Sequence, residues 1–403
     1  MHTLTLPVRT SAALAACLLA APALRAQTAP SATSATNLPP IIVQASRTGK
    51  TAMAMPAAVQ VITGEEIAKS GYASTAEVLE KKGGVFIRTM SSNPTLSQIA
   101  MRGFGDNSFG RVLVLVNGER LNSPDMSAPN LMRIPVGSIT RIEILHGPQT
   151  VLQGDYATAG VINIITDDST TEPKTTIGGS VGAYDTYSAY GNTTGGFADE
   201  GVTYRASLDW DKSGGYRSNS DYEIFEGNAA VRKDFGENRF LSLSTFYNDS
   251  EYGLPGSLSY KQYKNTPKIT LTPDDRCEQE SYGLNLGGRS TAGADGYVDA
   301  HFTASHRTTD SRWISSFGRS YYDSDIYAYA FTPQYVLETP IAGHQNILTV
   351  GSDLRYNDTR FDSDYYSAYY TSLLEWDYDR ASVAGYVQDE FFFTDELSLN
   401  LGG

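Results

Sequence analysis

Few residues in this sequence have the type and spacing needed for chemistry. Two acidic pairs, Asp323 with Asp325 and Asp362 with Asp364, could hold Ca²⁺ in loops through their carboxylates. The spacing of an EF-hand loop is absent, and acidic loops are usually only solvated. The mature chain has no nucleophile elbow, phosphate-binding loop, zinc-hydrolase motif or dinucleotide fingerprint. We therefore assign no catalytic residue, no metal ligand and no cofactor other than this possible calcium, and we do not expect an enzyme.

The other polar residues of the second half suit an interior wall better than a reaction centre. His301 and His306 fall on opposite faces of one extended segment, which gives a zinc or haem site little support. His301 and four further positions are interpreted as polar filling of a lumen, the four being Arg205, Asp299, Asp353 and Arg355.

Composition excludes several classes of protein. The 31 Lys+Arg against 45 Asp+Glu give a net charge of −14, which argues against wholesale nucleic-acid binding. No apolar run after the N-terminus is long enough for a membrane-spanning helix. Of the 44 aromatic residues, 5 precede Thr170 and 39 follow it, and the later region also carries a net charge of −16. Two physically different regions are therefore joined in one chain.

The chain begins with a predicted secretory signal at residues 1–26. Ser11–Leu24 is a short apolar core, and cleavage would leave Gln27 as the first residue. A lipoprotein signal ending at Cys17 is the alternative, but the apolar core continues past that cysteine. Removal of Cys17 leaves Cys277, which is then a free thiol or has lost a partner beyond Gly403.

Residues 27–50 form a predicted linker that contains a short extended segment. Its first part is rich in Ala, Thr, Ser and Pro and has no charge. The β-prone residues Ile41, Ile42, Val43, Gln44 and Ala45 follow two prolines. Taken alone, this segment is either captured by the sheet edge of another protein or is the first strand of the next domain.

Residues 51–170 have the pattern of a small α+β domain. Thr63 and Ser74 are each followed three residues later by a glutamate, which predicts two capped helices, the second over Thr75–Lys82. The apolar run Val112–Val116 predicts a buried strand, and the Asn-Gly pair after it predicts a tight hairpin. Further strands are expected at 139–145 and 161–166.

Residues 171–403 alternate apolar and polar residues in segments of about ten, which is typical of a transmembrane antiparallel β-barrel. The clearest segments are 202–211, 239–248, 297–305 and 348–357, with a last one at 397–401. A soluble β-sandwich also buries one face, but its strands are usually shorter. Long polar loops are expected at 249–279 and 365–379, beside short turns such as 198–201. Unequal loops favour the barrel.

The run from Leu96 to Thr166 resembles the plug domain of TonB-dependent outer-membrane receptors. It contains AMRGFG at 100–105, VLVLVNGERL at 112–121 and IPVGSITRIEILHGPQTVLQGDYATAGVINIIT at 134–166. His146 and Gln153 depart from the family pattern, in which Arg and an aromatic residue are usual. The resemblance implies a barrel of about 22 strands filled by the plug. It also identifies Ile41–Ala45 as a TonB box.

That resemblance implies energised import of a scarce substrate across the outer membrane, of the ferric siderophore, cobalamin or haem type. The implied partners are the periplasmic domain of TonB, a small metal chelate or cobalamin-like substrate, and outer-membrane lipid. Loops at 89–97, 104–110 and 122–130 should face the substrate. We predict contacts from Asn93, Asp106, Asn107, Asn122, Asp125, Met126 and Asn130, although ordinary solvated loop residues are an alternative for each.

Chain length is too small for the implied barrel. At about 20 residues per strand and loop, residues 171–403 give roughly 11 or 12 strands, too few to enclose a folded plug. Our hypothesis is that the sequence is part of a longer receptor, which a stop codon directly after Gly403 would contradict. A passive porin and an adhesion or secretion barrel remain alternatives, but a porin needs neither a plug nor residues 41–45. The substrate itself cannot be read from the sequence.

Overall fold

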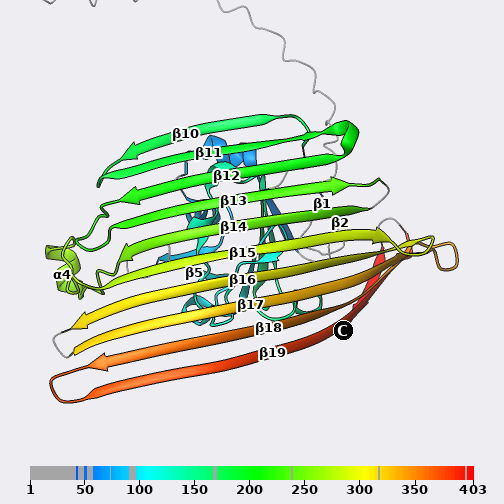
Figure 1. Ribbon diagram of the computed structural model, residues 1–403. Coiled ribbons are helices and arrows are strands. Elements are labelled where there is room, and N and C mark those ends of the chain that lie inside the picture. Colours follow the sequence, from blue (N-terminus) through cyan, green and yellow to red (C-terminus); the bar gives the residue numbers. More distant parts are fainter. Residues whose placement is uncertain are drawn as a thin grey trace, which may run out of the picture. The chain divides into compact units, whose positions relative to one another are not determined.

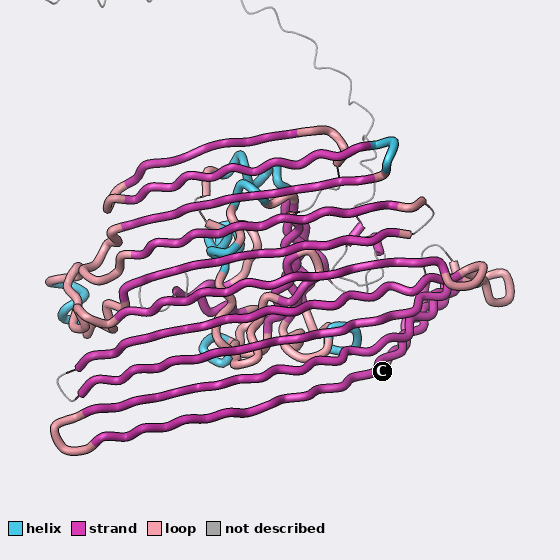
Figure 2. Tube along the Cα trace, in the orientation of Figure 1, coloured by secondary structure: helices cyan, strands magenta, loops and turns pink. Residues whose placement is uncertain are grey.

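The computed structural model describes residues 42–43, 50–51, 58–72, 74–89, 97–166, 170–236, 239–315, 318–394 and 397–403. The predicted signal, most of the linker and Asn93 lie outside these residues. Among the helices in the described part of the chain, none is long and apolar enough to cross a membrane. Figure 2 shows helices among the N-terminal elements and, in the C-terminal region, at α4 (Tyr260–Asn265) and at the 3-10 turn η6 (Ala198–Glu200), each in a connection between strands of the large sheet.

The N-terminal region is built on a five-stranded sheet in the order β3-β8-β9-β6-β7. Its strands are β3 (Ala58–Thr63), β6 (Val112–Val116), β7 (Glu119–Arg120), β8 (Arg141–His146) and β9 (Gly160–Ile165). Every residue of β9 is buried, because both faces of the sheet are covered by apolar side chains. The predicted strands and the Val112–Val116 core strand are therefore confirmed. Asn117 and Gly118 have φ of 52° and 86°, as the predicted tight hairpin requires.

Two short helices pack on this sheet. The helix α1 (Gly64–Ser70) begins at Thr63, whose side chain and that of Glu66 bond each other's backbone N–H groups. The helix α2 (Thr75–Lys81) begins at Ser74, whose hydroxyl accepts a bond from the N–H of Glu77. Both predicted helices are confirmed, and their apolar faces join the main core through Ile67, Val78 and Leu79.

Smaller elements complete the N-terminal region and the segment before it. They are β1 (Ile42–Val43), β2 (Lys50–Thr51), β4 (Phe86–Thr89), β5 (Ser97–Ala100), η3 (Gly105–Asn107), η4 (Leu131–Arg133), η5 (Val136–Ser138) and α3 (Thr150–Gln153). β1 pairs with β2, and β4 pairs with β5, each in an antiparallel two-stranded sheet.

The C-terminal region is one antiparallel sheet of 11 strands in chain order. Figure 1 shows β10 to β19 lying side by side in that order. The strands are β10 (Lys174–Gly182), β11 (Thr186–Phe197), β12 (Val202–Ser213), β13 (Tyr222–Asp234), β14 (Phe240–Gly253), β15 (Arg276–Thr291), β16 (Gly296–Ser315), β17 (Gly318–Glu338), β18 (Asn346–Tyr366), β19 (Thr371–Phe392) and β20 (Ser398–Gly402). The predicted count of 11 or 12 is confirmed. The predicted domain boundary near residue 170 stays a prediction.

The two faces of the large sheet differ as the alternation predicts. In β12, Leu208 is 60% exposed on one face while the neighbouring Asp209 on the other is only 6% exposed. Residues two apart in a strand share a face, so Tyr204, Ala206, Leu208 and Trp210 form one outward surface of β12. An apolar outer band and a polar inner face are what a barrel in a bilayer requires.

The predicted loop lengths are partly wrong. The segment 365–379 is no long loop, because β18 runs to Tyr366 and β19 starts at Thr371, leaving a turn at 367–370. Acidic and aromatic residues alternate at 375–379, and the acidic residues made this part of β19 resemble a polar loop in the sequence. The 249–279 segment is shorter than expected, since β14 ends at Gly253 and β15 starts at Arg276, with the helix α4 (Tyr260–Asn265) between them. The predicted short turn at 198–201 is confirmed and contains η6 (Ala198–Glu200).

Candidate functional site

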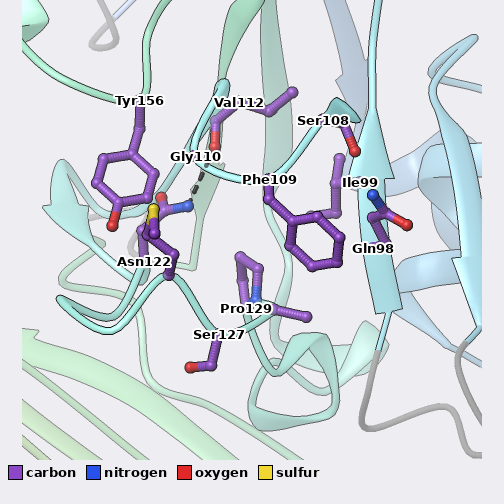
Figure 3. Close-up of a pocket in the computed structure, with 12 residues that line it drawn as sticks. Gln98, Ile99, Ser108, Phe109, Gly110, Val112, Asn122, Ser127, Pro129 and Tyr156 are labelled. Carbon is purple, nitrogen blue, oxygen red and sulfur yellow. Dashed lines mark hydrogen bonds between the residues drawn. The ribbon is translucent and has the colours of Figure 1, made fainter. Parts of the chain in front are cut away.

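Two of the predicted plug loops converge on one pocket (Figure 3). The segments around 108–110 and 122–129 meet there, with Tyr156 on one side and β5 on the other. The pocket is a shallow hollow with a cavity volume of only about 20 Å³, enough for about one water molecule. Its lining residues are Gln98, Ile99, Ser108, Phe109, Gly110, Val112, Asn122, Met126, Ser127, Ala128, Pro129 and Tyr156. Residues from β5, from both loops and from the segment at Tyr156 therefore share one recess.

Asn122 and Asn130 hold the loop rather than reach outward. The Asn122 amide donates to the carbonyl of Val112 at 3.1 Å and accepts from the N–H of Val114 at 2.7 Å. The Asn130 side chain accepts from the N–H of Met132 at 3.0 Å and so caps η4. Both amides satisfy backbone groups, which is the usual role of asparagine at turns and helix starts.

The remaining predicted contacts differ in accessibility. The carboxylate of Asp106 accepts a bond from Arg88, and the carbonyl of Asn107 accepts from Nε of Arg111 at 2.6 Å. Met126 lies in the pocket wall, is 58% exposed and has φ of 61°, so a thioether is presented on a strained turn. Of the predicted set, Met126 is the residue best placed to touch a ligand.

Asp125 connects the pocket loop to the large sheet. One carboxylate oxygen accepts a bond from Nη2 of Arg307 on β16, and the other accepts from the N–H of Ser127 at 3.0 Å. Nη1 of Arg307 also donates to the Ser127 hydroxyl at 2.8 Å. Burial tends to raise the pKa of Asp125, but Arg307 and the Ser127 bonds outweigh it, so the pKa lies below its ordinary value. A loop in this position is held in place by a charge from the wall.

A second connection was not foreseen from the sequence. Glu119, in the tight hairpin after β6, accepts from the hydroxyl of Thr303 at 2.8 Å and lies 3.4 Å from Nδ1 of His301. His301 also lies 3.1 Å from Asp299. The Asn-Gly turn in the sequence predicts that Glu119 lies at the tip of a hairpin. No sequence pattern identifies Thr303 and His301 as the residues that it contacts. His301 and Asp299, predicted to line a polar wall, lie on the side of the sheet that faces this hairpin.

A third set of contacts involves arginines. The Arg133 guanidinium lies 3.9 Å from the centre of the Phe246 ring and 3.9 Å from the buried Glu226 carboxylate. Burial lowers the pKa of Arg133, and Glu226 opposes this. Arg205, predicted to line the lumen, donates to the hydroxyl of Thr166 at 2.5 Å. The plug is thus joined to β12, β13, β14 and β16 by polar contacts on one face of the sheet.

The other predicted wall residues lie on that same face. Asp353 and Arg355 are two apart on β18, with their charged groups 3.5 Å from each other. Arg355 contributes to lowering the pKa of Arg120 on the plug, after burial, which has the larger effect. These side chains therefore confront the plug, as the lumen interpretation implies.

Only part of the predicted TonB box can be described. Ile42 and Val43 form β1, which pairs with Lys50 and Thr51. Ile41, Gln44 and Ala45 lie outside the described residues. The backbone at the centre of the segment is extended, the conformation that strand addition uses.

The predicted calcium ligands are not in loops. Asp323 and Asp325 lie within β17, and Asp362 and Asp364 lie within β18, so their placement in loops was wrong. Within the residues that the structure describes, no group of three or more His, Cys, Asp or Glu side chains is arranged to hold a metal ion. Calcium binding stays an untested prediction. Cys277 is a buried free thiol beside Tyr252 and Leu254.

Comparison with known protein families gives an independent view. Residues 51–161 match the model of the TonB-dependent receptor plug domain. The chain is 29% identical over 248 residues to the vitamin B12 transporter BtuB of Vibrio vulnificus, covering 61% of this chain and 37% of that one. It is 27% identical over 254 residues to the vitamin B12 transporter BtuB of Photobacterium profundum, covering 60% and 41%. The chain spans well under half the length of these relatives.

Solved structures share the fold. The unliganded ferric citrate transporter FecA gives a TM-score of 0.76 at 18% identity, covering 87% of this chain and 56% of that one. The pyoverdine outer membrane receptor FpvA from Pseudomonas aeruginosa PAO1, bound to pyoverdine, gives 0.76 at 14% identity, covering 90% and 58%. At these identities the likeness concerns the fold alone: a mainly β barrel with an N-terminal plug.

Proposed function

Because this chain belongs to the TonB-dependent outer-membrane receptors, we propose that it works in the energised uptake of a scarce substrate. The substrate would be a small metal chelate or a cobalamin-like molecule, of the kinds named for the relatives above. We further propose that the signal at residues 1–26 is cleaved on export, so that Gln27 becomes the N-terminal residue of the mature chain.

One observation carries this proposal more than any other. The pocket loop at 122–129 is held to the wall through Asp125 and Arg307, so the surface that would meet a substrate is also a plug-to-wall contact. A substrate that contacts this loop changes the surroundings of that ion pair. A ligand shifts an equilibrium only as far as it interacts differently with the two states, and this contact offers such a difference.

The proposed energy input arrives through residues 41–45. Substrate binding rearranges the plug and frees this segment for the periplasmic domain of TonB, which adds it as a strand. Strand addition depends on backbone N–H and C=O groups more than on side-chain identity. The segment then transmits a pull to the plug.

Substitution in this segment tests the proposal. Proline at Ile42 or Val43 removes a backbone donor, whereas Val43→Ala keeps it. We expect Val43→Pro to abolish uptake while leaving substrate binding at the cell surface intact, and Val43→Ala to retain most uptake. Normal uptake by Val43→Pro contradicts the TonB-box assignment. Uptake that persists in cells lacking TonB would favour the passive porin instead.

A further inference from the structure

The strands β16 to β19 extend beyond their contacts with the plug, and their register determines which residues share a face. The pairing is uninterrupted between β16 and β17 and between β18 and β19, and β17 keeps one register with β18. Arg307 of β16 bonds the plug, so residues that alternate with it from β16 face the plug side. Residues that are paired directly across neighbouring strands share a face. The pairing therefore places Tyr322 of β17, Phe361 of β18 and Trp376 of β19 on the plug side as well.

Acidic residues in this part of the sheet are confined to the opposite face. Nine carboxylates lie there: Asp310, Asp323, Asp325, Asp358, Asp362, Asp364, Glu375, Asp377 and Asp379. The plug-side face has none at residues 308–314, 319–327, 357–366 and 371–380, all of which the structure describes. The acidic excess of the C-terminal region is therefore turned away from the plug side here.

Aromatic rings take the place of acids on the plug side. The Tyr322 and Phe361 rings lie 6.2 Å apart, and Phe361 stacks on Trp376 at 5.5 Å with 24° between the ring planes. Trp376 is 54% exposed, so a ring face remains available. Trp313 and Tyr378 share this face. We call these five residues the aromatic wall: Trp313, Tyr322, Phe361, Trp376 and Tyr378.

A cation lies beside the aromatic wall. Arg380 follows Tyr378 on the same face of β19. The wall therefore combines aromatic faces with one positive charge on the plug side of the sheet.

These features select among substrate chemistries. Aromatic faces attract flat rings by stacking, and a surface with an arginine and no carboxylates favours a negative ligand. A corrin is fringed with neutral amides and gains less from such a wall. Resting on the proposed function, we propose that the aromatic wall binds the aromatic chelating rings of an anionic ferric chelate, of catecholate or phenolate type.

Uptake measurements with three probes test this substrate class. Cells that produce the whole receptor are given radiolabelled iron as a tris-catecholate or as citrate, which has no ring, and labelled cyanocobalamin. We expect TonB-dependent uptake of the catecholate above the other two. Preferential uptake of cyanocobalamin or citrate overturns the substrate class but leaves the proposed function standing. Lack of TonB dependence for all probes, with the receptor at the cell surface, removes both.

Variants assign the effect to the wall. Trp376→Ala and Phe361→Ala should each weaken catecholate binding by about threefold to tenfold, the usual worth of one ring contact, and Trp376→Phe should restore most of it. Trp210→Ala is the matched control, because Trp210 lies in β12 on the face away from the plug. Each variant is compared at equal surface amount. Unchanged catecholate affinity in both alanine variants, with the control also unchanged, overturns the proposal.

Discussion

The ion pair between Asp125 and Arg307 should hold the plug loop to the wall by a measurable free energy. The side chains are 28% and 16% exposed, so the pair is only partly screened by water. A hydrogen bond to a charged group contributes about 1.5–3 kcal/mol, and contacting charges couple by about 0.5–3 kcal/mol. We therefore expect Asp125→Asn and Arg307→Gln each to lower the free energy of local opening of residues 122–130 by about 1–3 kcal/mol.

A double-mutant cycle measures the coupling directly. Hydrogen exchange of the 122–130 amides in the detergent-purified receptor gives the opening free energy for wild type, both single variants and the double variant. The double variant should lose less than the sum of the single losses, by about 1–2 kcal/mol, because the second substitution removes an already unpaired charge. Arg88 and Asp106 form a control pair with side chains 54% and 80% exposed, for which coupling should stay below about 1 kcal/mol.

Additive effects at Asp125 and Arg307 would refute this reasoning. Equal coupling in the exposed control pair would also refute it, because the argument rests on partial burial. The total loss alone decides nothing, since either single variant leaves one charge without its partner.

Three other outcomes follow from the plug. Glu119 and Asp125 have pKa values below their ordinary range despite burial, so their stabilisation is present at neutral pH and is lost as the pH falls below about 4; a flat unfolding free energy from pH 7 to 3 would contradict this. Asn122→Ala should cost about 1–3 kcal/mol by leaving the Val114 N–H unpaired, whereas Asn107→Ala should cost under about 0.5 kcal/mol in the same urea titration. Gly118→Ala should lower the free energy of unfolding by about 1 kcal/mol, because alanine is strained at the φ of 86° that Gly118 adopts. A variant with the same thermal stability as the wild type would contradict this expectation.

Local signals explain why the plug fold could be predicted from the sequence. The Thr63 cap, the Val112–Val116 run and the Asn-Gly turn each act within a few residues, and the structure keeps all three. The same locality explains the failure at 365–379, where Trp376 and Tyr378 lie on one face and Glu375, Asp377 and Asp379 on the other. Acidic residues that alternate with aromatic ones give this stretch the polar composition of a loop, so its composition gave no signal for a strand.

The site could be predicted only in part, because its partners are far apart in sequence. Asp125 was correctly placed on a plug loop, but its partner Arg307 lies 182 positions away. The backbone hydrogen bonds of Asn122 could not be predicted either. An asparagine in a loop gives the same sequence pattern whether its side chain binds a ligand or the backbone. Arg133 and Glu119 carried no distinguishing pattern of their own.

Comparison of uptake with and without TonB is the most direct test of the central claim. Radiolabelled substrate accumulation is followed in otherwise identical cells that produce equal surface amounts of the receptor. We expect accumulation well above surface binding when TonB is present, and surface binding alone when TonB is absent. Equal accumulation in the two strains would contradict energised transport by this protein.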